Sequence, residues 1–265
     1  MFVHLVEGGL AVPLNIETHT ICKPDKAMAN IRHALSLPYP WLHRAERPKG
    51  KTVSICGAGP SLADTYKDLS GDVMACNSAI TWLDDRVNVD CAMMFDPHPD
   101  MVKFARRIPG CRYYLASRCD PAVFEALEGE NIILWHAMGD AGMTELLEDT
   151  PLPVEKHEPL LHGGSTAVTR ALYLAAAIGY SEIHIHGADS SMRDGETHVA
   201  GSIMEEEPRD VWALGKKYRT TNWLAQQAKE FQVLIGPLEA EGCTVTVHGD
   251  GMFPDIWRQG WNQSK

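Results

Sequence analysis

The chain has no long hydrophobic run. Its longest strongly apolar stretch, residues 171–178, is far shorter than the about 20 residues that a membrane-spanning helix needs. The first residues also lack a basic segment followed by an apolar one, so we expect neither a membrane span nor a signal peptide. With 45% hydrophobic and 22% charged residues, the composition is typical of a soluble globular protein.

Positive charge is also scarce. The formal net charge is −11 at pH 7, so the surface as a whole does not attract phosphate. This charge disfavours binding to duplex nucleic acid through a general basic surface. A locally positive pocket for a single nucleotide is still compatible with it.

Paired cysteines are missing as well. The seven cysteines form an odd set with no C-x-x-C spacing. Cys56, Cys76, Cys91 and Cys111 lie in or beside expected strands, where cysteine packs as a small hydrophobic residue. We therefore expect free thiols in a reducing compartment, which indicates a cytoplasmic protein.

Strand and helix patterns alternate after a start that is punctuated by prolines. We expect an N-terminal extension over residues 1–48, with a helix over residues 26–35 capped by Asp25, and one domain over residues 49–265. The expected strands cover residues 53–56, 73–76, 91–95, 112–115, 132–135, 183–186 and 245–247, and the expected helices cover residues 101–107, 121–127, 166–178 and 210–233. Such alternation predicts an α/β, Rossmann-like fold: a mostly parallel sheet with helices on both faces. Ligands bind such sheets at the carboxyl ends of the strands.

A glycine-rich turn follows the first expected strand of the domain. Gly57, Gly59, Pro60 and Ser61 stand between that strand and an expected helix start, and we call residues 57–61 the glycine turn. Glycines let the backbone approach a ligand closely, and the N–H groups at a helix start favour phosphate. The dinucleotide fingerprint is incomplete, because Leu62 replaces its third glycine and no Walker lysine follows. The pattern predicts a phosphate site, with an ordinary tight turn as the alternative.

A second helix start that suits phosphate is expected at residues 163–166. Gly163 and Gly164 precede Ser165, the expected N-cap, and Thr166 opens an alanine-rich helix. The N–H groups of its first turn could bind an anion. A capped core helix without a ligand is the alternative.

Two residues are candidates for the chemistry of the site. Asp189 follows an expected strand, and His198 lies in a short glycine-containing loop beyond it. A loop histidine that titrates near neutrality suits general acid–base work, and Asp189 could orient it or hold a metal. His184 and His186 share one strand face, so a zinc site with Asp189 and His198 is an alternative. We favour packed, hydrogen-bonded imidazoles over that zinc site.

Asn77 and Asp96 each follow an expected strand directly. An asparagine there can read a base or a ribose with its donor and acceptor, and an aspartate can hold Mg²⁺ or a ribose hydroxyl. Either residue could instead cap the next helix. We expect both at the sheet edge that carries the glycine turn, with Asp96 as the ligand of Mg²⁺.

The order of these motifs resembles a known family. The glycine turn is followed by Asn77, residues 89–96, residues 162–165 with the alanine-rich helix, and residues 185–189 leading to residues 194–198. This order resembles the domain of archaeal 6-hydroxymethylpterin diphosphokinases. It is similar to the central domain of motility accessory glycosyltransferases that modify flagellin. More distantly, it resembles bacterial sialyltransferases with a Gly-x-Gly-Pro-Ser-Leu turn.

The resemblance implies a nucleotide-binding domain. The glycine turn matches the turn that receives the nucleotide phosphates in this family, and Asn77 matches a nucleotide contact. Asp189 and His198 match an acidic strand end and a late histidine, which serves as base in the sialyltransferase relatives.

The proteins that this sequence resembles catalyse two kinds of reaction. One moves a diphosphate from ATP to a hydroxymethyl acceptor with Mg²⁺, and the other moves an acidic sugar from a CMP carrier. Because the chain lacks the flanking domains of the flagellin-modifying enzymes, we favour diphosphate transfer from ATP. A non-catalytic nucleotide-binding or structural module is a third interpretation. The expected partners are a nucleotide and a small-molecule acceptor, and a homo-oligomer is compatible with the sequence.

Overall fold

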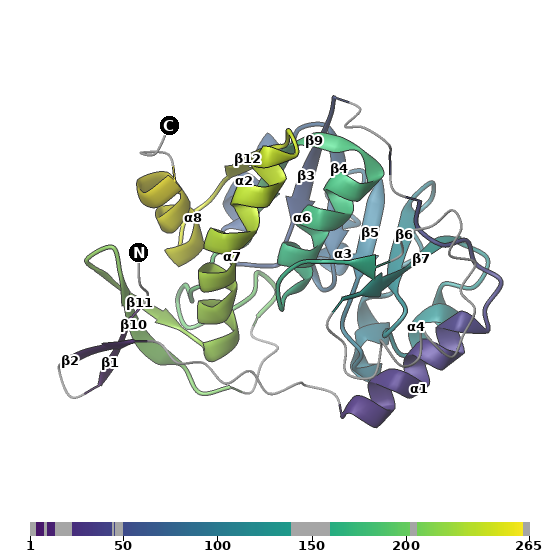
Figure 1. Ribbon diagram of the computed structural model, residues 1–265, viewed down its shortest axis with the longest axis horizontal. Helices are drawn as coiled ribbons and strands as arrows, with labels where there is room; N and C mark the ends of the chain where they lie inside the picture. The colour runs from purple at the N-terminus through teal and green to yellow at the C-terminus, as the bar shows by residue number, and fades with distance from the viewer. Residues whose placement is uncertain are drawn as a thin grey trace.

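The main layer of the protein is a parallel β-sheet. The computed structural model describes residues 4–7, 10–13, 23–43, 45, 50–138, 160–201 and 206–261. Within these residues the sheet has eight strands in the order β12-β9-β3-β4-β5-β6-β7-β8 (Figure 1). Every neighbouring pair is parallel, which confirms the predicted sheet. The strands are β3 (Lys51–Cys56), β4 (Asp72–Cys76), β5 (Cys91–Met94), β6 (Arg112–Ala116), β7 (Asn131–Ala137), β8 (Leu160–Leu161), β9 (Tyr180–His186) and β12 (Thr244–Val247).

Apolar sequences, interrupted by the buried Ser54 in β3, explain why the middle of this sheet is buried. Residues 53–56 of β3 and residues 73–76 of β4 are all buried, and so is the whole of β5. A parallel strand covered on both faces requires such a run, because side chains on both of its faces lie in the core. The same runs produce the sequence-based strand predictions.

Helices cover both faces of the sheet. α6 (Ala167–Ile178) packs on β3, β4, β5 and β9, and α7 (Asn222–Ala240) packs beside it and on β12 (Figure 1). Five short helices lie in the connections from β3 to β7: α2 (Leu62–Thr65), η1 (Tyr66–Asp68), α3 (Ala79–Leu83), η2 (Pro99–Phe104) and α4 (Pro121–Ala126). Because crossovers between parallel strands are right-handed, these connections lie on one face, and α6, which leads back to β9, lies on the other.

The burial pattern of α6 shows how it docks on the sheet. Val168, Ala171, Leu172 and Ala175 are buried at the i, i+3, i+4 and i+7 positions of one helix face. The alanines let the helix approach the strands closely, while burial of Leu172 contributes about 1.5–3 kcal/mol. Gly179 ends the helix with a left-handed φ of 102°.

Two expected helices differ in the structure. The helix expected over residues 210–233 is wrong in its first half, where β10 (Arg209–Ala213) and β11 (Lys216–Thr220) form an antiparallel hairpin. α7 begins only at Asn222, after Thr221 has capped it. The helix expected over residues 101–107 is the shorter 3₁₀ helix η2.

The hairpin has a physical cause that is visible in its turn. Leu214 and Gly215 have φ values of 56° and 74°, and a two-residue hairpin loop of this type needs positive φ at both positions. Val211 and Tyr218 lie opposite each other and are both buried, whereas Trp212, Lys217 and Arg219 next to them are exposed. This period of two is typical of a strand and incompatible with a helix.

The first residues of the chain contact the domain at two places. β1 (His4–Glu7) and β2 (Leu10–Pro13) join the hairpin in a separate antiparallel sheet with the order β11-β10-β1-β2. α1 (Pro24–Leu35) packs on α4, and Lys26 forms an ion pair with Asp120 at 2.8 Å. Asp25 is not the cap of α1, because the helix already begins at Pro24 and Asp25 lies inside its first turn. The domain boundary at residue 48 stays a prediction.

The cysteines and the surface agree with a packed α/β core. The six cysteines in the described residues are buried free thiols: Cys56, Cys76, Cys91, Cys111, Cys119 and Cys243.

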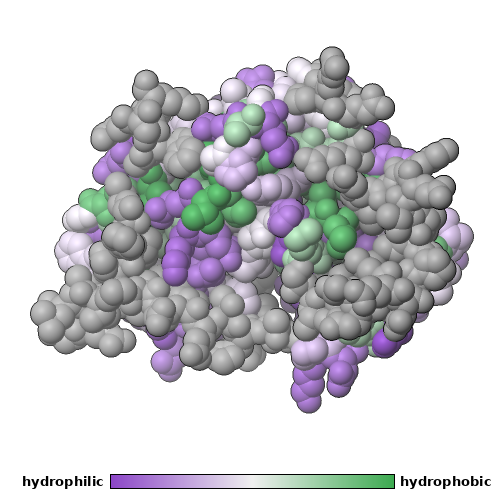
Figure 2. Space-filling model, in the orientation of Figure 1, coloured by the Kyte–Doolittle hydropathy of each residue, from purple (hydrophilic) through white to green (hydrophobic). Residues whose placement is uncertain are grey.

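On the face shown in Figure 2, apolar residues form small separate groups among hydrophilic ones. No helix in the described part of the chain has the length and hydropathy to cross a membrane. After β12 the chain ends its described part in α8 (Met252–Ile256) and the π-helix η3 (Trp257–Trp261).

Candidate functional site

The order of the strands in the sheet reverses between β3 and β9, which are parallel neighbours. β3 is followed by β4 on one side, while β9 lies on its other side with His186 opposite Cys56. The loops after β3 and β9 therefore separate at a topological switch point, where α/β proteins bind ligands. We call the side on which the parallel strands end the carboxyl edge. The glycine turn and Asp189 both lie at this edge, as the sequence predicts.

The glycine turn packs directly against the loop after β9. The N–H of Gly57 donates to the carbonyl of His186 at 2.8 Å, and the N–H of Gly59 donates to that of Gly187 at 2.7 Å. A Cβ on Gly59 would lie 2.7 Å from the Gly187 oxygen and 2.8 Å from Asp189 Oδ1, which is closer than real atoms approach. The contact between the two loops therefore requires these glycines. Their N–H groups serve this contact here, a different use from the phosphate contact that the sequence predicts.

Asp189 is the polar centre of that contact. The N–H of Ser61 donates to Asp189 Oδ2 at 2.7 Å, and its hydroxyl donates to Oδ1. Pro60 and Ser61 are buried, and Asp189 is only 4% exposed. Burial raises the pKa of Asp189 to about 6, while the two hydrogen bonds from Ser61 oppose this rise. The carboxylate thus holds the start of α2.

The loop that carries His198 folds back onto the glycine turn. Arg193 and Glu196 exchange backbone hydrogen bonds around a turn at Asp194 and Gly195. The N–H of Val199 then donates to the carbonyl of Ala58 at 2.7 Å, which brings His198 beside the turn. Sequence segments that lie about 140 residues apart on one chain meet only because β3 and β9 are neighbours.

The imidazole of His198 has a defined partner. Its Nδ1 lies 2.8 Å from the hydroxyl of Thr197, and within the described part of the chain no hydrogen bond joins it to Asp189. Burial lowers the pKa of His198 to about 4, so the ring is neutral at pH 7. Thr197 therefore takes the orienting position that the sequence suggests for Asp189.

The start of α6 is occupied by a carboxylate from α7. Glu230 accepts hydrogen bonds from the N–H of Ser165 at 2.7 Å and from its hydroxyl at 3.0 Å. The N-cap is Thr166 and not Ser165, because the Thr166 hydroxyl accepts from the N–H of Thr169 in a capping box. A Cβ on Gly164 would collide with Glu230, and one on Gly163 would lie 2.8 Å from Arg170. The carboxylate of Glu230 thus binds where a phosphate was expected, at Ser165. Contact of residues 163–166 with a nucleotide stays a prediction.

Asn77 and Asp96 also lie at the carboxyl edge. Asn77 has a left-handed φ of 46°, and its Oδ1 accepts from the N–H of Phe95 at 3.2 Å, so it joins the ends of β4 and β5. Asp96 Oδ1 accepts from the N–H of His98 at 3.3 Å. Burial raises the pKa of Asp96, and the positive charge of Arg118 partly offsets this rise. Neither residue caps an α-helix through its side chain in the described structure.

The described residues contain no group of three or more side chains that could hold a metal ion. His184 and His248 share a hydrogen bond of 2.9 Å, and the rings of His186 and His248 stack at 4.3 Å. Both ring nitrogens of His186 are buried without a hydrogen-bond partner among the described residues, so the preference for packed imidazoles over a zinc site stays a prediction. A lone Asp96 is still compatible with Mg²⁺, which proteins often hold with one or two carboxylates and the substrate phosphates.

Sequence reasoning missed the side chains that tie these loops together. Arg193 forms an ion pair with Asp64 on α2 and lies 3.8 Å from Asp250. Glu230 reaches Ser165 from the middle of α7. Neither residue has a local motif, since each interaction joins segments that lie far apart in the sequence. The turn at Asp194 and Gly195 is the one local signal that points to Arg193.

The comparisons with known proteins show the family and the fold of the chain. A family model described as 6-hydroxymethylpterin diphosphokinase MptE-like matches residues 25–195, more than half of the chain. The chain belongs to this MptE-like family. The matched residues run from α1 to the loop before His198 and include the glycine turn, Asn77, Asp96 and Asp189. No curated protein matches the chain.

Two solved structures have a similar fold. The MAf glycosyltransferase from Magnetospirillum magneticum AMB-1 superposes with a TM-score of 0.65 and 14% identity over 89% of this chain. This chain spans 38% of the length of that protein. At such low identity, the likeness shows a shared fold. A mammalian sialyltransferase superposes with a TM-score of 0.42 and 9% identity, over 88% of this chain and 81% of its own.

Proposed function

We propose that this MptE-like protein is a nucleotide-dependent transferase whose site lies at the carboxyl edge beside β3 and β9. The observation that carries the proposal is the convergence of the glycine turn, Asp189 and the His198 loop at the switch point. Asn77 and Asp96 follow the adjacent strands on the same edge. Family membership supports a transferase, because the family model is described as 6-hydroxymethylpterin diphosphokinase MptE-like.

The favoured reaction is transfer of a diphosphate from ATP to a hydroxymethyl-type acceptor. The nucleotide would lie over the glycine turn, with Asn77 at its base or ribose. Asp96 would hold Mg²⁺, and this ion would neutralise phosphate charge when bound. Asp189 keeps the turn in shape through Ser61, which makes it a positioning residue in this scheme.

His198 is the residue that we assign to proton transfer. Its ring is neutral at pH 7 because burial lowers its pKa to about 4, so it can accept a proton from an acceptor hydroxyl. A base with so low a pKa is weak. The negative charge of bound nucleotide phosphates would raise its pKa toward neutrality and make it more effective. Thr197 fixes the orientation of the ring through Nδ1, at a separation of 2.8 Å.

A second candidate is sugar transfer from a CMP carrier. It is supported by the fold shared with the MAf glycosyltransferase over 89% of this chain. The same arrangement of a nucleotide cradle and a base for a hydroxyl would serve either reaction. The two differ in the nucleotide that binds and in the need for Mg²⁺.

A nucleotide screen by thermal shift separates these candidates. A ligand present at 100 times its Kd stabilises the folded state by about 2.7 kcal/mol, which corresponds to a rise in Tm on the order of 5 °C. A rise with ATP that requires Mg²⁺ supports diphosphate transfer, whereas a rise with CMP alone supports sugar transfer. If ATP, GTP, CTP and CMP all leave Tm unchanged, the transferase proposal fails and a non-catalytic module becomes the better interpretation.

A further inference from the structure

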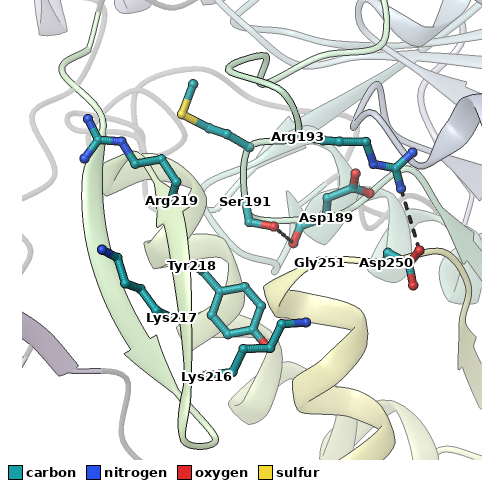
Figure 3. A pocket seen from close by; sticks show the side chains of 10 residues that line it. Asp189, Ser191, Arg193, Lys216, Lys217, Tyr218, Arg219, Asp250 and Gly251 are labelled. Carbon is teal, nitrogen blue, oxygen red and sulfur yellow. Dashed lines mark hydrogen bonds and ion pairs between the residues drawn. The ribbon is translucent and has the colours of Figure 1, made fainter.

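A cavity of ≈ 240 Å³ lies between the β10–β11 hairpin, the loop after β9 and the segment before α8 (Figure 3). Asp189 forms part of its wall, so the cavity adjoins the glycine turn through Ser61. The hairpin and the segment before α8 lie beyond residue 195, where the family match ends. Two of its three walls are therefore built by residues outside the family match.

The outer rim of the hairpin carries an excess of positive charge. Lys217 and Arg219 leave the same side of β11, opposite to Tyr218 (Figure 3). Asp210 on β10 forms ion pairs with both of them, at 2.6 Å and 3.2 Å. One carboxylate thus serves two cations, which leaves one net positive charge on this rim.

The inner side of the hairpin also forms ion pairs. Lys216 and Arg258 form ion pairs with Asp255 at 2.8 Å and 3.0 Å. The hydroxyl of Tyr218 also donates to Asp255, at 2.7 Å. Arg258 comes from η3 and also lies 3.8 Å from Asp250, so Asp255 balances Lys216 on this side. The excess positive charge of the hairpin is that of Lys217 and Arg219 around Asp210, in a chain whose net charge is −11.

The wall opposite the hairpin has the reverse sign. Arg193 forms ion pairs with Asp64 and with Asp250, and Arg258 also lies 3.8 Å from Asp250. Three carboxylates, counting Asp189, therefore face two cations. The side chain of Asp250 is 81% exposed, so its oxygens are accessible from the cavity mouth. This wall therefore offers hydrogen-bond acceptors and negative charge.

Opposite walls of opposite sign select a particular ligand chemistry. A phosphate or carboxylate group would contact the basic hairpin, and hydroxyl or ammonium groups would donate to the exposed Asp250. A bare phosphate would use one wall only, and a neutral sugar or an amine the other. The volume is below the about 300–1,000 Å³ of pockets for drug-sized ligands, so the ligand is small.

We propose that this cavity binds the acceptor substrate, and that the acceptor is a small anion which also carries hydroxyl or ammonium groups. The role of this ligand as acceptor rests on the proposed transferase function. Its chemistry is inferred from the charges of the two walls. The hairpin thereby becomes the element that selects the acceptor, next to a nucleotide site built from residues of the family match.

Calorimetric titration of the full chain with three compounds tests this chemistry. Glucosamine 6-phosphate carries both an anion and donors, inorganic phosphate carries the anion alone, and glucosamine carries the donors alone. We expect glucosamine 6-phosphate to bind about tenfold more tightly than either of the others, because each wall then contributes a charge-assisted hydrogen bond. Equal affinity for inorganic phosphate and glucosamine 6-phosphate would overturn the proposal.

Two variants assign the walls separately. Lys216→Gln leaves Asp255 paired with Arg258 and Tyr218, so it should fold, and it should weaken binding of both phosphate compounds by about three- to tenfold. Asp250→Asn keeps the shape of the side chain and should weaken glucosamine 6-phosphate binding while inorganic phosphate binds as before. Lys51→Gln, at the amino end of β3, is the matched control and should bind all three compounds like the wild type.

The outcomes separate this proposal from the proposed function. If nucleotides raise Tm but glucosamine 6-phosphate shows no preference over the other two compounds, the cavity proposal alone is wrong. If the variants behave as expected but no nucleotide binds, the ligand chemistry holds and the transferase function is wrong. If Lys216→Gln and Asp250→Asn keep wild-type affinities with unchanged Tm, the walls do not bind the ligand.

Discussion

The glycine turn and the β10–β11 hairpin lie on either side of Asp189 and are built on different principles. At the glycine turn, backbone groups and buried side chains satisfy each other, because Gly57 donates to the last residue of β9 and Gly59 and Ser61 donate to the loop after it. At the hairpin, exposed cations share too few carboxylates. The first region lies inside the family match and the second outside it.

This difference indicates how the protein divides its tasks. A close-packed turn tolerates little change, since any added atom collides with backbone. An exposed charged wall can change one side chain at a time with little effect on stability. We therefore assign the shared step, nucleotide binding, to the turn, and the choice of acceptor to the hairpin.

The largest effect is expected at His198. His198→Ala should lower turnover by about 10²–10⁴-fold, the usual contribution of a positioned base, and leave nucleotide affinity nearly unchanged. Turnover and Tm are measured on the same preparation, with His33→Ala on α1 as the control. A structural role for His198 would instead lower Tm without a specific loss of turnover, and a fully active variant would remove it from the mechanism.

A smaller effect is expected from a substitution at Gly59, but it should change both stability and nucleotide affinity. Gly59→Ala places a methyl group against the Gly187 carbonyl and the Asp189 carboxylate, so the free energy of unfolding should fall by about 1–3 kcal/mol. Nucleotide affinity should fall with it. Gly110→Ala is the control, because it has a left-handed φ of 77° and open space around it. It should lose about 1–2 kcal/mol while nucleotide affinity is unchanged.

Asp189 should produce a pH-dependent effect of similar size. Folding raises its pKa from 3.8 to about 6, so the folded state binds this proton more tightly than the unfolded state. The resulting stabilisation is complete below pH 3.8 and is lost as the pH rises through 6. Asp189→Asn removes this pH-dependent contribution. From pH 4 to pH 7 the free energy of unfolding of the variant, relative to that of the wild type, should therefore rise by on the order of 2–3 kcal/mol. Denaturant titrations at several pH values measure this, and parallel profiles would contradict it.

The smallest effect is expected on the rim of the hairpin. Lys217→Gln leaves Asp210 paired with Arg219, and exposed ion pairs contribute little, so stability should change by about 0.5 kcal/mol or less. Chemical denaturation gives this value directly. A loss comparable to that of Gly59→Ala would erase the contrast between the two regions.

The same contrast explains what could be predicted from the sequence. The strands at residues 53–56, 73–76 and 91–95 are short apolar runs bounded by turn residues, and the parallel sheet follows from their alternation with helices. Because Asn77, Asp96 and Asp189 each follow a parallel strand, the topology alone predicts that they lie at the carboxyl edge. It does not predict what their side chains contact. These parts depend on local pattern and on topology.

The contacts within the site depend on long-range geometry and could not be predicted. Ser61 and Asp189 are each conspicuous in the sequence, yet nothing local says that one donates to the other. Glu230 is one of two acidic residues in α7, and its position against Ser165 follows from how α6 and α7 pack. The local signal for the hairpin was weak, because Gly215 suits its turn but Leu214, with a φ of 56°, is not a residue that predicts one.

Hydrogen exchange with and without a nucleotide tests the central claim most directly. In the presence of ATP and Mg²⁺, or of CMP, we expect slower exchange in the glycine turn, at the end of β4 and in residues 194–199, with little change at the amino ends of the strands. Binding that protects only other segments, or protects none of these three, would contradict a nucleotide site at the carboxyl edge.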